Sequence, residues 1–311
     1  MFIACRVDSN EIVGTGHLMR CINLLTVLEG DKLILTNSDI ISPYPFINLH
    51  SNGLIDDINK TIAILKTRKP DIFIIDNYEI SVQWEKEVKP YCKKLVVIDD
   101  LNRTHVCDIL INQNIGAENK YTDLQCIKLL GCKYVIFNQN IRKYYPRFRH
   151  RIISILISFG GSDPEHNTLK VIQQIEWSNI IYFIVVGQYN TDYAEIKRAT
   201  LEKSNCIVYN SLSQVDFYNL MDIVDLSIGS CGTTSYERCY LGLPSIVITT
   251  IDNQQEISTK LEEIGCIKKI NNVFEIKNII QTIDVAHMSE NCLQLVDYKG
   301  TERIKENLLY V

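Results

Sequence analysis

The residue with the clearest chemical potential in this sequence is a histidine in a loop that contains two glycines. The apolar run Phe2–Val7 is followed by Gly14-Thr15-Gly16-His17 and then by an apolar pattern with helical spacing. This order places His17 at the start of a helix, and the two glycines allow a sharp turn and a close approach to a ligand. A helix N-terminus disfavours a positively charged imidazole, so His17 is suited to take a proton from water as a general base. The alternative is that His17 only caps the helix or packs against it.

Polar side chains also follow two later apolar runs of the first half. Asp76-Asn77-Tyr78 comes after one run, and Asp99-Asp100 comes after the next. In open α/β sheets, ligands bind beyond the carboxyl ends of the strands, so these side chains can face a ligand. Tyr78 is predicted to donate a hydrogen bond to a sugar or phosphate oxygen. Asp99 is predicted to orient the histidine or to hold the first loop, with capping of a turn or helix as the alternative.

The second half contains two loops of small residues that suit an anion. Gly160-Gly161-Ser162 follows a strand-like run and precedes a helical pattern. Gly232-Thr233-Thr234 follows a later run in the same way. Backbone N–H groups and the helix dipole at such positions stabilise a diphosphate without a metal.

Glu237 and two amides complete the predicted binding residues of this half. Glu237 lies one helical turn after Thr233, and its carboxylate can accept two hydrogen bonds from the hydroxyls of a ribose. A simple capping box is the alternative for this pair. Asn253 and Gln254 follow another apolar run, and their amides both donate and accept, which suits sugar hydroxyls.

The elements that must position these residues alternate between short apolar runs and helical patterns, and the runs show little polar alternation. This is typical of an α/β protein with parallel sheets that are buried on both faces. The predicted strands are Phe2–Val7, Lys32–Thr36, Asp71–Asp76, Lys94–Ile98, Asp108–Asn112, Arg151–Phe159, Ile180–Val186, Cys206–Tyr209, Val224–Ile228 and Pro244–Thr249. The predicted helices are His17–Leu28, Ile55–Thr67, Val82–Tyr91, Glu165–Ile175, Ala194–Glu202, Thr234–Leu241, Gln254–Ile264 and Thr301–Tyr310.

The pattern restarts after a polar stretch around Phe137–His150, which indicates two domains. We expect a first Rossmann-like domain over 1–148 and a second, nucleotide-binding one over 149–311, with the last helix packing back on the first. Two such halves with a nucleotide-sugar cleft between them are the GT-B architecture. The basic run Arg142–Arg149 at the join is interpreted as a solvated linker, not a nucleic-acid site.

Composition excludes several other classes of protein. The net charge is −5, which gives no nucleic-acid footprint, and no run of apolar residues is long enough to span a membrane. The first residues lack the basic segment of a signal peptide. The 11 cysteines show no Cys-x-x-Cys pair, which favours reduced, buried thiols. We therefore expect a cytoplasmic monomer without a metal or cofactor.

Several segments together resemble one family over nearly the whole chain. It is the family of UDP-sugar hydrolases in pseudaminic acid biosynthesis that act on UDP-2,4-diacetamido-2,4,6-trideoxy-β-L-altropyranose. The matching segments are Arg6-Val7-Asp8, Gly14–Cys21, Ile98–Leu101, Asp108–Asn114, Leu130–Tyr134, Phe159–Asp163 and Gly232–Glu237. The segment Phe137–Ile141 departs from the Leu-Arg-Pro-Glu-Phe that is common there in the family. The second half is also similar to that of the GlcNAc transferase of lipid II synthesis.

The resemblance implies a metal-independent, inverting hydrolase that serves flagellin or surface-glycan synthesis. It implies that His17 is the base with Tyr78 nearby, that Arg20 belongs to the sugar site, and that Glu237 binds the ribose of UDP. Two alternatives remain from the residues themselves. One is a GT-B glycosyltransferase that uses a UDP-sugar donor, and the other is a non-catalytic nucleotide-sugar-binding subunit.

Overall fold

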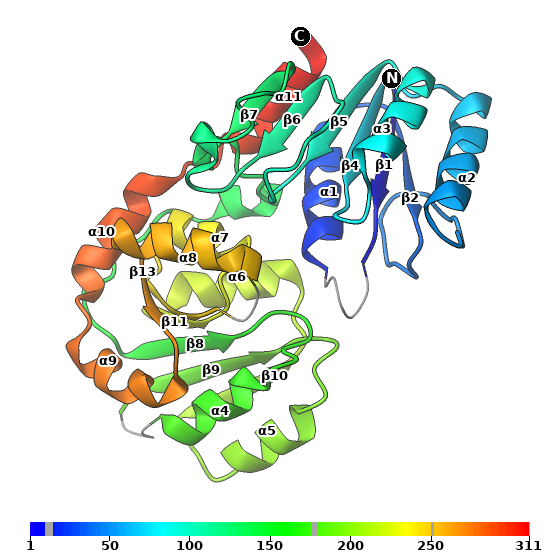
Figure 1. Cartoon of the computed structure of the whole chain (residues 1–311). Helices are drawn as coiled ribbons and strands as arrows, with labels where there is room; N and C mark the ends of the chain where they lie inside the picture. Colours follow the sequence, from blue (N-terminus) through cyan, green and yellow to red (C-terminus); the bar gives the residue numbers. More distant parts are fainter. Residues whose placement is uncertain (10–14, 176–178, 250–251, 311) are drawn as a thin grey trace. The chain divides into compact units, whose positions relative to one another are not determined.

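The computed structural model describes residues 1–9, 15–175, 179–249 and 252–310 of the chain, without the side chains of residues 252 and 253. The chain forms two compact units, drawn in Figure 1. The first comprises Met1–Gln139 together with Tyr298–Val311, and the second comprises Asn140–Asp297. The sequence predicted the join at 148/149, with the last helix packing back on the first domain. The structure places the join at 139/140 and returns the chain to the first unit at 297/298, so the predicted place of the last helix is confirmed.

The segment interpreted as a solvated linker is exposed at residues 142, 143 and 145–148, but it belongs to the second unit and contacts it through Tyr144 and Arg149. Arg149 is 1% exposed, and its guanidinium donates hydrogen bonds to the carbonyl oxygens of Met221 and Val224. The hydroxyl of Tyr144 lies 2.6 Å from Oδ1 of Asn219. The sequence did not reveal this buried arginine, because a short run of charges is usually exposed to water. In the structure, the Arg149 guanidinium instead satisfies backbone carbonyl oxygens.

The first unit contains a seven-stranded parallel sheet in the order β3-β2-β1-β4-β5-β6-β7. Its strands are β1 (Phe2–Val7), β2 (Asp31–Thr36), β3 (Phe46–Asn48), β4 (Ile72–Asp76), β5 (Lys94–Ile98), β6 (Ile109–Asn112) and β7 (Ile127–Leu130). Its helices are α1 (Gly16–Val27), α2 (Leu54–Thr67), α3 (Val82–Val88) and α11 (Gly300–Tyr310), with short 3-10 turns at Lys89–Tyr91, Ala117–Asn119 and Cys132–Tyr134.

Alternate side chains of β1 enter two separate cores, as the period of a strand requires. Ile3, Cys5 and Val7 pack with α1 and α11 on one face, whereas Phe2 and Ala4 pack with α2 and α3 on the other. Gly300 lets α11 approach closely, because a Cβ at this position would lie 2.6 Å from the backbone nitrogen of Val135.

The second unit contains a six-stranded parallel sheet in the order β10-β9-β8-β11-β12-β13. Its strands are β8 (Ser154–Ser158), β9 (Ile181–Val186), β10 (Cys206–Asn210), β11 (Leu226–Gly229), β12 (Ser245–Ile248) and β13 (Ile267–Ile270). Its helices are α4 (Asn167–Gln174), α5 (Tyr193–Thr200), α6 (Gln214–Ile223), α7 (Thr234–Tyr240), α8 (Asp252–Glu263), α9 (Ile276–Thr282) and α10 (Val285–Leu295), with 3-10 turns at Gln139–Lys143 and Val273–Glu275.

Each sheet has one point where the strand order reverses direction. In the first unit it lies between β1 and β4, and in the second it lies between β8 and β11. Ligands of doubly wound sheets bind at such switch points, beyond the carboxyl ends of the strands. The loops that follow β1, β4, β8 and β11 are therefore where each unit offers a ligand site.

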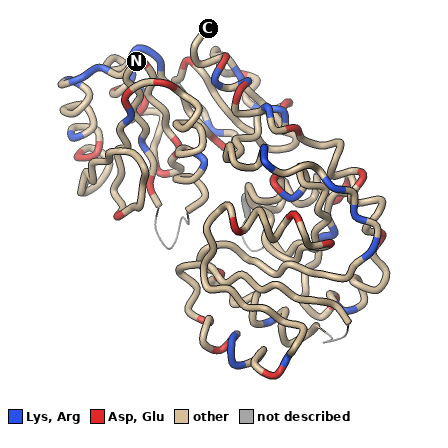
Figure 2. Tube along the Cα trace, turned by 180° about the vertical axis from the view of Figure 1, so that it is seen from behind, with Lys and Arg blue, Asp and Glu red and all other residues tan. Residues whose placement is uncertain are grey.

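Charged residues of both signs are interspersed along the trace of each unit (Figure 2). Among the described residues, no helix has both the length and the apolar character needed to cross a membrane.

Candidate active site

His17 and Asp76 meet at the switch point of the first unit. His17 is the second residue of α1, and Asp76 is the last residue of β4. Nδ1 of His17 lies 2.6 Å from Oδ1 of Asp76, and the two side chains are 13% and 0% exposed. Because a carboxylate can only accept, we assign the Nδ1 proton to His17, which makes Nε2 the nitrogen with a lone pair. This is the arrangement that a neutral general base needs.

Arg20 fixes the carboxylate that orients His17. Its Nε and Nη2 donate to the two oxygens of Asp76, both at 2.8 Å, and Nη2 also lies 3.0 Å from Oδ2 of Asp100. Burial opposes ionisation of Asp76, but the charge of Arg20 and the hydrogen bonds from His17 and Arg20 outweigh it and hold the pKa of the carboxyl below its ordinary value. Asp76 is therefore a fixed negative charge beside the imidazole.

The phenol ring of Tyr78 packs against the imidazole ring of His17. The ring centroids of Tyr78 and His17 lie 4.5 Å apart at an interplanar angle of 87°. The Tyr78 hydroxyl donates to Oδ2 of Asp100 at 2.7 Å, and burial followed by the charge of Asp100 raises the pKa of the phenol far above its ordinary range. Tyr78 therefore stays protonated and holds the imidazole from the side.

These residues line a cavity of about 130 Å³ in the first unit. Its walls also carry several polar side chains, which can donate to or accept from hydroxyl and amide groups. The lining residues are Asp8, His17, Asn37, Ser38, Asp76, Asn77, Tyr78 and Glu79. The cavity has room for a small polar group next to the imidazole.

The prediction that Asp99 orients His17 is corrected by the structure, which gives this place to Asp76. Asp99 follows β5, and its carboxylate accepts from Nε of Arg103 at 2.7 Å and from the hydroxyl of Tyr121 at 2.9 Å. Asp99 also lies 3.4 Å from Nε2 of His105, whose Nδ1 contacts Glu85 at 2.7 Å. Asp99 thus stabilises the loop after β5, because β4, not β5, is the neighbour of β1.

The predicted anion loops lie at the switch point of the second unit. Gly160 follows β8 with a φ of +86°, a conformation that favours glycine. A cavity of about 100 Å³ contacts Gly160 from one loop and Ser230 and Thr234 from the other. Gly161 and Ser162 continue the first loop, and Gly232 and Thr233 precede α7 in the second. The two loops therefore share one small polar cavity.

Arg238 supplies a buried positive charge to this cavity, although the sequence did not predict it as a site residue. It is 3% exposed and lines the cavity, and its Nη2 donates to the carbonyl oxygen of Ser230 at 2.6 Å and to Oγ of Ser235 at 3.0 Å. Burial lowers the pKa of this guanidinium. The hydrogen bonds described for it go to uncharged oxygens, so the cavity suits an anionic group.

Glu237 is 8% exposed and accepts a hydrogen bond from the Tyr218 hydroxyl at 2.6 Å. Burial raises the pKa of Glu237. The capping-box alternative is not observed, because the N-cap residue Thr233 makes no side-chain capping bond. Tyr218 of α6 therefore orients the carboxylate that was predicted to bind a ribose.

The remaining predicted residues are placed as follows. Gly14 lies outside the described residues. Gly16 begins α1, is not among the glycines with positive φ, and faces open space where its Cβ would be, so the backbone turn does not require it. Asn253 lies in α8, as does Gln254, whose Oε1 is buried and accepts no hydrogen bond from the described residues.

Comparison with known structures defines the class. This chain has the GT-B fold: its full length aligns with the full length of Acinetobacter baumannii MurG at a TM-score of 0.70 and 11% identity. It also aligns with a UDP-N-acetylglucosamine 2-epimerase at a TM-score of 0.62 and 16% identity, over 99% of this chain and 95% of that one. At these identities the likeness concerns the fold. No protein-family model matches the chain.

Two relatives in sequence are closer. The chain is 26% identical over 85% of its length to the UDP-2,4-diacetamido-2,4,6-trideoxy-β-L-altropyranose hydrolase of Campylobacter jejuni, of which 97% is covered. The resemblance indicated by the motifs is thereby confirmed. This chain is also 28% identical over 82% of its length to an uncharacterized protein of Methanocaldococcus jannaschii, and it spans only 57% of that protein.

Proposed function

We propose that this protein is an enzyme that hydrolyses a UDP-2,4-diacetamido-2,4,6-trideoxy sugar to UDP and the free sugar. The observation that carries the proposal is the contact between His17 and Asp76, which makes His17 a general base at the switch point of the first unit. The similarity to the Campylobacter hydrolase supports the choice of substrate class. We further propose that the product serves pseudaminic acid synthesis for surface glycans, in the cytoplasm.

The proposed reaction is one displacement at the anomeric carbon. Water forms the new C–O bond while Nε2 of His17 takes its proton, and the bond between the anomeric carbon and the UDP oxygen breaks. Asp76 stabilises the imidazolium that results, and Arg20 keeps Asp76 ionised. Attack opposite the leaving group inverts the configuration. General base catalysis contributes roughly 10²–10⁴ in rate, so leaving-group stabilisation and positioning must contribute the rest.

We assign the leaving group to the second unit. Arg238 and the loops at Gly160 and Thr234 line a cavity of about 100 Å³, and a buried cation there stabilises the charge that develops on a departing diphosphate. Glu237, oriented by Tyr218, is assigned to the ribose hydroxyls. Because the positive charge comes from Arg238 and backbone N–H groups, the mechanism calls for no metal.

The test is NMR of the purified chain with UDP-2,4-diacetamido-2,4,6-trideoxy-β-L-altropyranose in ¹⁸O-labelled water and without any acceptor. The expected result is UDP plus free sugar, with the label on the anomeric oxygen and the inverted anomer appearing first. Label in the phosphate would place the attack on phosphorus and contradict the role of His17. Turnover that needs an added hydroxyl acceptor would indicate a transferase, and UDP binding without turnover would indicate a binding subunit.

A further inference from the structure

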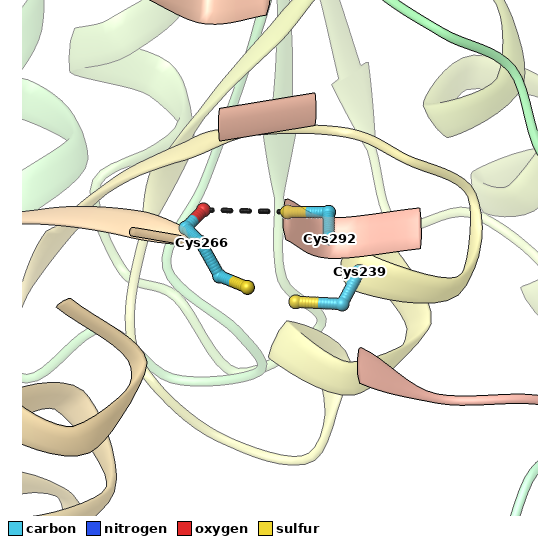
Figure 3. A group of neighbouring side chains, drawn as sticks. All are labelled: Cys239, Cys266 and Cys292. Atoms are coloured by element: carbon cyan, nitrogen blue, oxygen red, sulfur yellow. Dashed lines mark hydrogen bonds between the residues drawn. The ribbon is translucent and has the colours of Figure 1, made fainter. Parts of the chain in front are cut away.

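Three buried cysteine side chains that the proposed mechanism does not use converge in the second unit. Cys239 lies in α7, Cys266 directly precedes β13, and Cys292 lies in α10. Their sulfur atoms all lie within 4.8 Å of one another, and the side chains point toward a common centre (Figure 3). Each residue is at most 1% exposed. Buried thiols scattered through a core are ordinary packing, whereas three that converge from separate elements form a potential ligand set.

The spacing of the sulfurs is close to what a single cation requires. A cation with three metal–sulfur bonds of about 2.3 Å in a plane holds its sulfurs about 4 Å apart. The cluster therefore needs a contraction of less than 1 Å to reach that geometry from a spacing of up to 4.8 Å. Sγ of Cys292 now donates to the carbonyl oxygen of Cys266 at 3.3 Å, and this weak bond is given up when the thiol loses its proton.

The number of ligands selects the kind of cation. Among the described residues, no fourth His, Cys, Asp or Glu joins the group. Soft thiolates select copper(I), zinc and iron–sulfur clusters. Structural zinc sites and iron–sulfur clusters have four protein ligands, so three thiolates favour copper(I). Three thiolates around a monovalent cation keep a net negative charge in a buried place. Arg238, next to Cys239 in α7, interacts electrostatically with Cys239 and Cys292 and offsets part of that charge.

We propose that Cys239, Cys266 and Cys292 bind one soft, thiophilic cation of the copper(I) type in a three-sulfur site. Each thiol that becomes a ligand releases its proton to the solvent, and the oxidation state of the cation does not change. The bound cation ties together α7, the start of β13 and α10. Because the site is closed to solvent, the cation enters by local opening of these elements, and loading is slow compared with diffusion.

The experiment uses the full chain, reduced and kept anaerobic, and incubated with copper(I) buffered by bathocuproine disulfonate. We expect one tightly held equivalent per chain, a higher Tm, and X-ray absorption that shows three sulfur neighbours at about 2.3 Å, as in other metal–thiolate sites. Cys266→Ser and Cys292→Ser should each weaken binding by more than the roughly 10–100-fold that loss of an outer partner costs. Cys206→Ser, which removes a half-buried thiol of β10, is the matched control and should bind as the wild type does.

Three results would overturn the proposal. The first is equal copper affinity in the wild type and Cys292→Ser, and the second is a copper environment with nitrogen or oxygen neighbours in place of three sulfurs. The third is a wild-type chain that yields all its copper to the chelator under conditions in which it retains zinc. The absorption measurement on the wild type decides the question even if a serine variant fails to fold.

Discussion

Replacing Asp76 by asparagine is expected to abolish most turnover while leaving UDP binding by the second unit intact. In the wild type, the Asp76 carboxylate accepts the Nδ1 proton of His17 at 2.6 Å. An asparagine amide can instead donate to Nδ1, which moves the imidazole proton to Nε2 and removes the lone pair that would accept a proton from water. The variant keeps the shape of the site and changes the tautomer.

The magnitude follows from what the base contributes. General base catalysis supplies roughly 10²–10⁴ in rate, and the corresponding Asp-to-Asn change in a serine protease triad costs about 10⁴. We therefore expect kcat to fall by about 10²–10⁴, or about 3–5 kcal/mol in activation free energy. The free energy of unfolding should fall by only about 1–3 kcal/mol, because Arg20 keeps Asp100 as a partner.

The assay is release of UDP under saturating substrate, with calorimetry of UDP binding and a urea unfolding curve on the same preparation. Asp225→Asn is the control, because Asp225 is also buried, at 6% exposure against 1% for Asp76, and bonds to Ser154 but belongs to neither predicted site. It should lose stability and keep turnover. If Asp76→Asn turned over within threefold of the wild type while His17→Ala was inactive, Asp76 would not set the tautomer.

Three further predictions follow from the site and its supports. His17→Asn should lose nearly all turnover and keep the UDP affinity of the wild type in calorimetry, and normal turnover would exclude His17 as the base. Glu237→Ala should weaken UDP binding about 10–100-fold, the cost of losing hydrogen bonds to a charged group, and Tyr218→Phe should weaken it less; unchanged affinity in both would remove Glu237 from the ribose site. Burial opposes protonation of His105, but its contacts with the carboxylates of Asp99 and Glu85 outweigh burial and raise its pKa from 6.5 to about 9. Protonation of His105 therefore adds about 3 kcal/mol to stability below pH 6.5, and urea unfolding should show this contribution lost as the pH rises through about 9, but absent in His105→Asn.

The parallel sheets could be predicted from the sequence because their central strands are apolar on both faces. The run Phe2–Val7 is buried at every position and was predicted with its observed bounds. Of the four edge strands, β10 was predicted, whereas β3, β7 and β13 were missed. Strand β3 has only three residues, and β13 reads Ile-Lys-Lys-Ile, with polar side chains that central strands do not tolerate. The helix predicted over Val82–Tyr91 ends at Val88 and continues as a 3-10 turn that contains Pro90, which cannot continue an α-helix.

The residues that face a ligand were harder to assign than the strands that carry them. Asp76 and Asp99 each follow a buried strand, so the linear pattern treats them alike. The order of strands in the sheet separates them, because β4 adjoins β1 and β5 lies one strand further out. That order is set by long-range pairing, which no local spacing encodes. Arg238 was missed for a similar reason, since the oxygens that hold it include Ser227 of β11 and Ser230 of the loop that follows this strand.

Helix α11 makes the first unit discontinuous in the chain. Ile304 and Leu308 belong to the same core as Ile3 and Val7, and the Thr301 hydroxyl bonds to the backbone of Phe137. During synthesis, the second unit is therefore complete before the ribosome reaches the piece that closes the first. The unit that begins the chain is the last to finish folding, and until residue 300 emerges the part of its sheet that α11 covers beside α1 stays exposed and open to association with other nascent chains.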